Sequence, residues 1–381
     1  MREPVGTGMP EAPPASSVPP FTAEHDELRD EIRRFVADEL RPHAAEWERA
    51  RWFPDEVFAR MAERGLLGLK YPVEYGGRGL GYVEDAILAR ELSRCGSGGL
   101  AAGIGAHVSI ATPPVWKFGT DAQKQRFLAP AIRGERIGAL GITEPGAGSD
   151  VAGIRTFARR VDGGYVVNGS KTFITNGVRA HFVVTAVRTT EEGGHHGISF
   201  LVIEKGMDGF SVSQKLEKLG WHASDTAELA FEDVFVPEEN LLGEENRGFH
   251  LIMANFQWER LAMALGAVGS MEVVLGRVVD AAAGRAELRH VVAELAVKLE
   301  VSRSLTNHAL YLFADGHDAI REVTEAKLLS QRSALELAEA AFRITDGDLE
   351  IGRALRDTRL GPIGGGSDEV MKEILGRQLG L

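Results

Sequence analysis

Hydrophobic residues recur every three to four positions near both ends of the chain and every second position in its middle. In the first zone, 21–133, one apolar stripe is formed by Leu28, Ile32, Phe35 and Val36. This spacing is typical of an amphipathic helix that buries one face. The pattern therefore predicts a helical N-terminal zone.

Proline and glycine divide this first zone into separate helices. Pro42 stops or bends the first helix, because its ring clashes with the preceding turn. A second helix is predicted over Asp55–Gly65, before the glycine-rich turn Gly76–Gly79. Asp121–Phe127 predicts the start of a further helix.

Between 134 and 242 the period changes to two, which predicts short strands separated by Gly, Asn and Asp. The predicted strands are Tyr165–Val167, Phe173–Thr175, Phe182–Val187, Ile198–Ile203 and Ala227–Phe231. Strands at this spacing predict a small barrel or sandwich.

The last zone, 243–381, returns to the helical period and is rich in Ala and Leu. It predicts long helices over Leu251–Leu275, Glu287–Phe313 and Arg321–Arg343. These helices are long enough to pack together as a bundle. The order of zones is therefore helical, then β, then helical, and the predicted fold class is α+β.

Charge and cysteine content narrow the function classes. The chain has 43 Lys plus Arg and 55 Asp plus Glu, which gives a net charge of −12. An acidic chain without a basic run is a poor candidate for binding nucleic acid or an anionic membrane. Cys95 is the only cysteine, which excludes an intramolecular disulfide and a cysteine-rich metal site. A single cysteine also fits a cytoplasmic location.

The sequence predicts neither a secretion signal nor a membrane span. Residues 1–20 hold six prolines and no apolar core, which predicts a disordered tail rather than a signal peptide. The most apolar window, Leu100–Trp116, contains Pro113 and Pro114. It is too short and too interrupted to cross a bilayer.

A run of small residues at Gly141–Asp150 is the first candidate for binding chemistry. Its glycines let backbone N–H groups approach a phosphate or the edge of a flat heterocycle, and Thr143 and Ser149 add hydroxyls. It is not the dinucleotide fingerprint, because Val151 stands where the third glycine is needed. On composition alone, a tight turn between strands is the simpler interpretation.

The second candidate is a carboxylate on an apolar helix. Glu259 stands beside Trp258, and neither Asn255 nor Met263 offers a cation for an i,i+4 pair. Such a carboxylate is either buried with a raised pKa, as a general base requires, or exposed on the surface. The residues alone leave both interpretations open.

Three further segments have simple structural interpretations when taken alone. Lys171–Gly177 ends in Asn-Gly and is typical of a hairpin. Ile363–Glu369 contains three glycines before a helical pattern, in which Ser367 or Asp368 could cap the helix. His195 and His196 are predicted to be solvated, and no metal site is predicted, because no third ligand is near in sequence.

Four ordered segments nevertheless resemble one known family. They are TEPGAGSD at 143–150, ITNG at 174–177, FEDVFVP at 231–237 and IGGGSDEVMKEILGR at 363–377. Together they resemble the acyl-CoA dehydrogenase family over 21–381. The resemblance implies an N-terminal helical domain at 21–133, a middle β-barrel at 134–242 and a C-terminal four-helix bundle at 243–381, usually assembled as a tetramer.

The resemblance also implies FAD, held between the barrel and the bundle. The positions that match the family's flavin contacts are Ile142, Thr143, Ser149, Phe173, Ile174, Thr175, Ser367 and Glu369. Among them, Thr175 is implied to face the flavin N5 edge, and Phe173 replaces the usual Trp against the ring. The implied substrate contacts are Ser149, Arg260 and Gly366.

The reaction implied by the resemblance is α,β-desaturation of an acyl thioester. A base removes the α-proton, and the β-hydride goes to flavin N5. The backbone N–H that would stabilise the enolate matches Gly365. Some branches of the family carry their base at this loop position, where a glycine cannot act. The isovaleryl and long-chain branches place it on the bundle helix directly before an Arg, which here predicts Glu259, followed by Arg260, as the base.

Two segments depart from the family pattern. Ala281–Arg289 is shortened and lacks the family's Phe-Gly and following Gln, and Arg285 is a candidate replacement. Phe342–Asp348 lacks the Gln-x-x-Gly-Gly-x-Gly run. In the family, both segments reach the FAD pyrophosphate region of a neighbouring subunit.

These departures leave three hypotheses about the protein. The chain is a homomeric dehydrogenase with an altered ADP half-site, one subunit of a heteromer whose partner supplies the missing contacts, or a carrier-protein-dependent or oxygen-using relative. The implied substrate is an acyl-CoA or an acyl carrier protein thioester, and the implied electron acceptor is an electron-transferring flavoprotein. Acyl chain length depends on pocket depth, which the sequence does not show.

Overall fold

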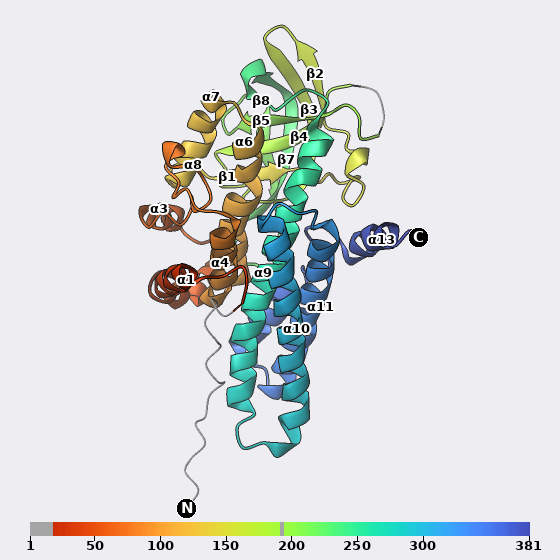
Figure 1. The fold of residues 1–381 in the computed structure, drawn as a ribbon. Helices are drawn as coiled ribbons and strands as arrows, with labels where there is room; N and C mark the ends of the chain where they lie inside the picture. The colour runs from red at the N-terminus through yellow and green to blue at the C-terminus, as the bar shows by residue number, and fades with distance from the viewer. Residues whose placement is uncertain (1–17, 191–193) are drawn as a thin grey trace, which may run out of the picture.

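The computed structural model describes residues 18–190 and 194–381, so the predicted disordered tail lies almost wholly outside the described residues. Within them the order is helical, then β, then helical, as predicted. The sheet and the helical bundle occupy opposite ends of the molecule, and the N-terminal helices pack along one side (Figure 1). The predicted α+β fold class is confirmed.

The N-terminal zone consists of short helices broken by tighter and wider turns. Its α-helices are α1 (Ala23–Phe35), α2 (Ala44–Ala50), α3 (Glu56–Glu63), α4 (Tyr82–Leu92), α5 (Gly98–Gly105), α6 (Thr112–Phe118), α7 (Asp121–Gln123) and α8 (Ala129–Ile132). After α1 the chain passes through a π-helical turn and a 3-10 turn that contains Pro42, so the proline bends the chain as predicted. A second π-helical segment, Ala106–Ala111, follows α5 directly.

The middle zone forms one eight-stranded sheet in the order β6-β7-β3-β2-β4-β5-β8, with β1 paired to β4. The strands are β1 (Gly138–Gly141), β2 (Phe157–Val161), β3 (Gly164–Thr175), β4 (Phe182–Arg188), β5 (Ile198–Glu204), β6 (Phe210–Lys215), β7 (Thr226–Pro237) and β8 (Leu241–Leu242). Neighbouring strands pair antiparallel except β1 and β2, which pair parallel to β4.

The structure corrects two predictions for this zone. The two runs at 165–167 and 173–175 are parts of one long strand, β3. The alternation of apolar and polar residues is interrupted along β3, because its register against β7 shifts at two places, before Gly169 and after Lys171. The Asn176–Gly177 turn does not form a hairpin, because β2 lies between β3 and the next strand, β4.

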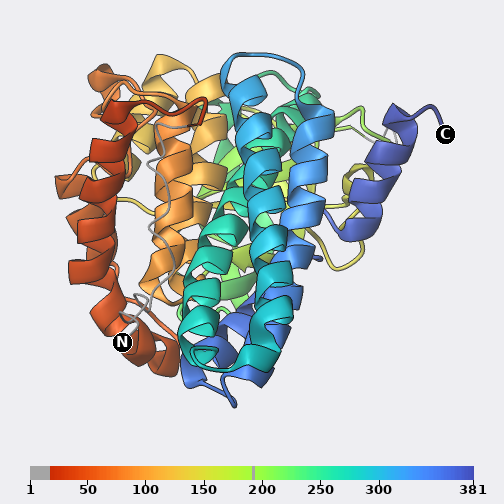
Figure 2. The same cartoon turned by 60° about the horizontal axis from the view of Figure 1, so that its bottom comes forward.

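The C-terminal zone is a bundle of three long helices and a shorter one. They are α9 (Gly248–Ala281), α10 (Arg289–Ala314), α11 (Ile320–Ile344) and α12 (Leu349–Thr358). The first and third contain their predicted helices, whereas α10 begins at Arg289, two residues after the predicted start at Glu287, because 286–288 form a 3-10 turn. A last helix, α13 (Asp368–Gln378), is capped by Ser367 and projects from the side of the bundle (Figure 2). It packs mainly on α11.

Helix α9 is central to the whole molecule. It packs against α4, α10 and α11, and Trp258 and Leu261 on it are completely buried. Among the described helices, α9 alone is long and apolar enough to cross a membrane by length and composition, with half of its apolar window buried inside the protein. The apolar side chains of α9 therefore pack in the protein core, and another face of the helix lines a cavity.

Candidate active site

A large cavity lies where the sheet, the N-terminal helices and the bundle meet, with a volume of about 1310 Å³. That exceeds the roughly 300–1,000 Å³ typical of a site for one small ligand. The predicted site residues that line it are Ile142, Thr143, Ser149, Phe173, Ile174, Thr175, Glu259, Arg260, Gly365, Gly366 and Ser367. Glu369 is the exception, because it is exposed in the first turn of α13 and does not line the cavity.

The loop after β1 is held in place by a buried ion pair that the sequence did not reveal. Glu144 accepts hydrogen bonds from Lys171 Nζ at 2.7 Å and from the Arg155 backbone N–H at 2.6 Å. Lys171 also donates to Ile142 O at 3.0 Å. Burial alone would raise the pKa of Glu144, but Lys171 holds it below its usual value. The pair therefore fixes Ile142 and Thr143 against β3.

Phe173 presents its ring to the cavity from an irregular point of β3. Its φ of 60° lies in the left-handed region, and its side chain is 68% exposed. Beside it, the Thr172 N–H donates to Thr143 O at 2.9 Å, which joins β3 to the small-residue loop. A strained backbone that turns a large apolar side chain out of the sheet is typical of a binding surface.

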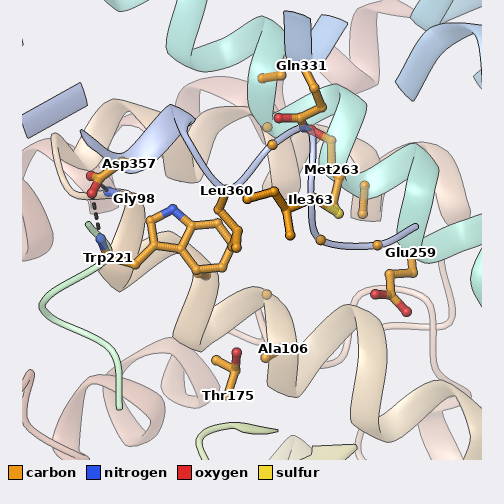
Figure 3. Close-up of a pocket in the computed structure, with 18 of the residues that line it drawn as sticks. Gly98, Ala106, Thr175, Trp221, Glu259, Met263, Gln331, Asp357, Leu360 and Ile363 are labelled. Atoms are coloured by element: carbon orange, nitrogen blue, oxygen red, sulfur yellow. Dashed lines mark hydrogen bonds between the residues drawn. The ribbon is translucent and has the colours of Figure 1, made fainter. Parts of the chain in front are cut away.

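Glu259 carries the clearest sign of acid–base chemistry. Burial raises the pKa of its carboxyl to about 7, against the opposing charges of Arg260 and Lys327. Its Oε2 is covered by the protein yet has no hydrogen-bond partner. The carboxyl points into the open space, and Thr175 lies on the opposite side of that space in Figure 3. Of the two interpretations left open by the sequence, the structure favours the first: Glu259 is half-buried, its Oε2 is covered and its pKa is raised.

The glycine loop between α12 and α13 is tied to the bundle by a lysine that sequence reasoning missed. Lys327 Nζ donates to Gly361 O at 2.9 Å and to Gly366 O at 2.6 Å. Burial lowers the pKa of Lys327 to about 8. The sequence signal that could have found it is a lysine inside the apolar stripe of α11.

Gly365 cannot be replaced by a residue with a side chain without a local rearrangement. Its φ is 61°, and a Cβ atom at this position would collide with Met263 Sδ. A side chain at this loop position therefore requires Met263 to move and the left-handed backbone to be strained.

Asp357 holds together the far wall of the cavity, and the sequence analysis did not predict it as a site residue. One of its carboxyl oxygens accepts from the Trp221 N–H at 2.6 Å and the other from the Gly98 N–H at 3.0 Å (Figure 3). Burial, followed by the neighbouring charge of Glu48, raises the pKa of Asp357 to about 7. This carboxyl joins α12, α5 and the loop before β7. Nothing in its sequence context distinguishes it from a surface residue.

The described residues contain no cluster of three or more His, Cys, Asp or Glu side chains placed to hold a metal. The rings of His195 and His196 are 4.0 Å apart between centroids, tilted by 40°, and both residues are exposed, as expected for solvated histidines.

Comparisons with known proteins agree with this geometry. The acyl-CoA dehydrogenase N-terminal, middle and C-terminal domains match residues 22–135, 139–234 and 246–380. The chain belongs to the acyl-CoA dehydrogenase family. Members of this family are FAD-dependent oxidoreductases, and this chain is an enzyme of that class.

Individual relatives match over nearly the full chain. Mitochondrial isovaleryl-CoA dehydrogenase of Arabidopsis thaliana is 37% identical over 93% of this chain and 90% of the relative. Long-chain specific acyl-CoA dehydrogenase of Mus musculus is 34% identical over 94% and 87%. A probable acyl-CoA dehydrogenase from Mycobacterium abscessus superposes with a TM-score of 0.91 at 41% identity, covering 94% of this chain and 99% of that one.

The cavity lining suits a flavin. Phe173 lines the cavity and is 68% exposed, and a Cβ added at Gly148, which also lines it, would meet no atom within 4 Å. An aromatic ring and an accessible backbone suit a flat heterocycle.

The two segments that the sequence predicts to depart from the family pattern meet at one end of the bundle. Arg285, in the turn between α9 and α10, donates to Ile344 O at 3.1 Å, before the link to α12. Its guanidinium also pairs with Glu287 at 3.5 Å. The two segments are therefore in contact, and neither Arg285 nor Ile344 lines the cavity.

We expect Gly365→Ala to lower the free energy of unfolding by about 1–3 kcal/mol, because the added methyl group meets both the left-handed backbone and Met263. Measured in a Met263→Ala background, the same Gly365→Ala change should cost less, since the collision is absent there and only the backbone strain remains. Urea unfolding followed by circular dichroism measures both. Gly376→Ala, in the open face of α13, is the matched control and should not destabilise. Equal stability of Gly365→Ala and the native chain would contradict the packing described.

Proposed function

We propose that this enzyme desaturates an acyl thioester between its α and β carbons, with Glu259 as the base that removes the α-proton. The observation that carries the proposal is the buried Glu259 carboxyl, whose pKa of about 7 suits proton abstraction near neutral pH. When bound, FAD supplies the acceptor for the β-hydride, so the thioester loses one proton and one hydride and gains a C=C bond.

The glycine loop stabilises the charge that develops during proton removal. An α-proton beside a thioester is only weakly acidic, so the enolate oxygen needs a fixed donor. We assign this role to the Gly365 N–H, because Lys327 fixes both ends of its loop through Gly361 O and Gly366 O. A donor fixed before the reaction needs no reorganisation when the charge appears.

The remaining lining residues orient the two ligands. The flavin contacts we propose are Ile142, Thr143, Ser149, Phe173, Ile174, Thr175 and Ser367. Arg260 and Gly366 lie beside the base, with Arg260 near Gly366 and its guanidinium 5.5 Å from the centre of the Phe256 ring. We assign them, with Ser149, to the substrate. Glu369 is left out of the proposed site, because it lies outside the cavity.

The proposed substrate is an acyl-CoA, with an acyl carrier protein thioester as the alternative form. We infer an electron-transferring flavoprotein as acceptor from the family resemblance. We infer a cytoplasmic location from the single cysteine, Cys95. The assembly is a homo- or hetero-oligomer, because the segments that depart at the bundle tip are those that reach a neighbouring subunit in the family.

Glu259→Gln should abolish reduction of the flavin by a thioester, by about 10²–10⁴-fold, because the amide cannot accept the proton. Its FAD content and thermal midpoint should match those of the native enzyme. The loss of the 450 nm flavin band on adding acyl-CoA, followed by stopped flow, measures the effect. Glu294→Gln, an exposed carboxylate on α10, is the matched control. Normal flavin reduction in Glu259→Gln would overturn the assignment.

The rate should also depend on pH through the ionisation of Glu259. Only the ionised carboxylate accepts a proton, so kcat/KM should rise about tenfold from pH 6 to pH 8 and then level off. The charged groups that act on it are Arg260 and Lys327. Loss of the positive charge in Lys327→Met should therefore move the midpoint to higher pH. A profile that stays flat from pH 5.5 to 8 would argue against Glu259 as the titrating group.

We expect the chain purified alone to hold about one FAD per protein, because all the proposed flavin-ring contacts come from this chain. The ratio of 450 nm to 280 nm absorbance measures it. A colourless protein that added FAD does not reconstitute would favour the heteromer, in which a related partner supplies the missing ADP contacts.

A further inference from the structure

The cavity does not end at the proposed base. From Glu259 it continues along one face of α9, where its lining residues follow the helical period as far as Arg277. They are Met263, Ala267, Ser270, Val274 and Arg277. Glu259 and Arg277 are 18 residues apart within one helix, which corresponds to about 27 Å at roughly 1.5 Å per residue.

Three other elements close this groove. Ile351 and Ala354 of α12 line one side, and Leu92 and Ser93 at the end of α4 line another. Near the base, α5 and the segment after it present small residues to the cavity, namely Ala102, Gly105 and Ala106. A Cβ added at Gly105 would meet no atom within 4 Å. The groove, defined here by Ala267, Ser270, Val274, Ile351 and Ala354, is therefore not blocked at its entrance.

Several polar groups along the walls already have partners within the protein. Ser93 Oγ donates to Gly266 O at 2.8 Å. Gln331 Nε2 donates to Met263 O at 2.8 Å. The oxygens of Asp357 accept from the Trp221 and Gly98 N–H groups. Between its ends the groove therefore offers a ligand mainly apolar surface, with Ser270 as a small polar residue within it.

Two ion pairs lie across the end of the groove that is far from Glu259. Arg277 Nη2 lies 2.5 Å from Glu350 Oε2, and Arg41 Nη2 lies 3.0 Å from Glu350 Oε1. These ion pairs connect α9, α12 and the turn after α1 across the end of the groove. An apolar ligand that enters beside Glu259 thus meets a polar boundary only after most of the length of the groove.

We propose that the groove binds the distal part of a long acyl chain, so that the enzyme acts on long-chain acyl thioesters rather than on short or branched ones. The inference rests on the proposed function, which places the reacting carbons beside Glu259. An acyl chain that extends from Glu259 along α9 transfers each of its methylene groups from water to contact with apolar side chains. A short branched acyl group would fill only the space near Met263 and Ala106.

The test is the dependence of kcat/KM on acyl length, measured with the FAD-loaded enzyme and saturated acyl-CoA thioesters of 4 to 16 carbons. We expect kcat/KM to increase with length and to favour 16 carbons over 6 by at least tenfold. Complete transfer of one methylene from water to an apolar wall allows up to about fourfold. A preference for 4 to 6 carbons, or for isovaleryl-CoA, would overturn the proposal.

Variants that narrow the groove provide the second measurement. Ser270→Leu should lower the ratio of kcat/KM for 16 carbons to that for 6 carbons by at least tenfold, and Ala354→Val should do the same where Ser270→Leu fails to fold. Gly276→Ala is the matched control on α9, because its added Cβ would meet no atom within 4 Å and Gly276 does not line the cavity. Its ratio should equal that of the native enzyme.

The remaining outcomes separate this proposal from the proposed function. If no thioester of any length reduces the flavin, the proposed function itself fails, and the proposal about the groove fails with it. If short thioesters reduce the flavin and the groove variants change the oligomeric state without changing the length ratio, the groove is an interface with a second copy. That result overturns the long-chain assignment and leaves Glu259 as the base.

Discussion

The buried ammonium of Lys327 is the interaction on which the arrangement of the active site depends. It joins Gly361 O and Gly366 O to α11, and so holds the glycine loop against the bundle. The loop carries the Gly365 N–H, and α9 carries Glu259, so one lysine fixes the position of the proposed donor relative to the proposed base. Its charge also opposes the effect of burial on the pKa of Glu259. Geometry and acidity are therefore coupled through the same group.

Lys171 plays the corresponding part on the sheet side of the cavity. It is fully buried, and it pairs with Glu144 and with Ile142 O in the loop after β1. Burying a charge is costly unless it has hydrogen-bonding partners, and each of these lysines has two. Both have their pKa lowered to about 8 by burial. Loops rich in glycine or small residues are flexible by composition. Each lysine holds one such loop in a fixed position at the wall of the site.

The sequence predicts that the chain matches the family pattern around Glu259 and departs from it at the tip of the bundle. Near Glu259, Met263 packs against Gly365, so a side chain at Gly365 would require Met263 to move. At the tip of the bundle, the turn containing Arg285 contacts Ile344. The two departures that the sequence predicts are thus neighbours in space, and neither Arg285 nor Ile344 lines the cavity.

The sequence by itself determined the order of the zones, the long helices of the bundle and the apolar helix that carries Glu259, because these depend on local period and side-chain type. It missed the continuous strand β3, since backbone irregularities near Gly169 and Phe173 interrupt the alternation. It also missed Lys327, whose carbonyl partners lie 34 and 39 residues away. Partners so distant along the chain, and the depth of a groove between helices, are set by long-range packing. Only the tertiary structure decided them.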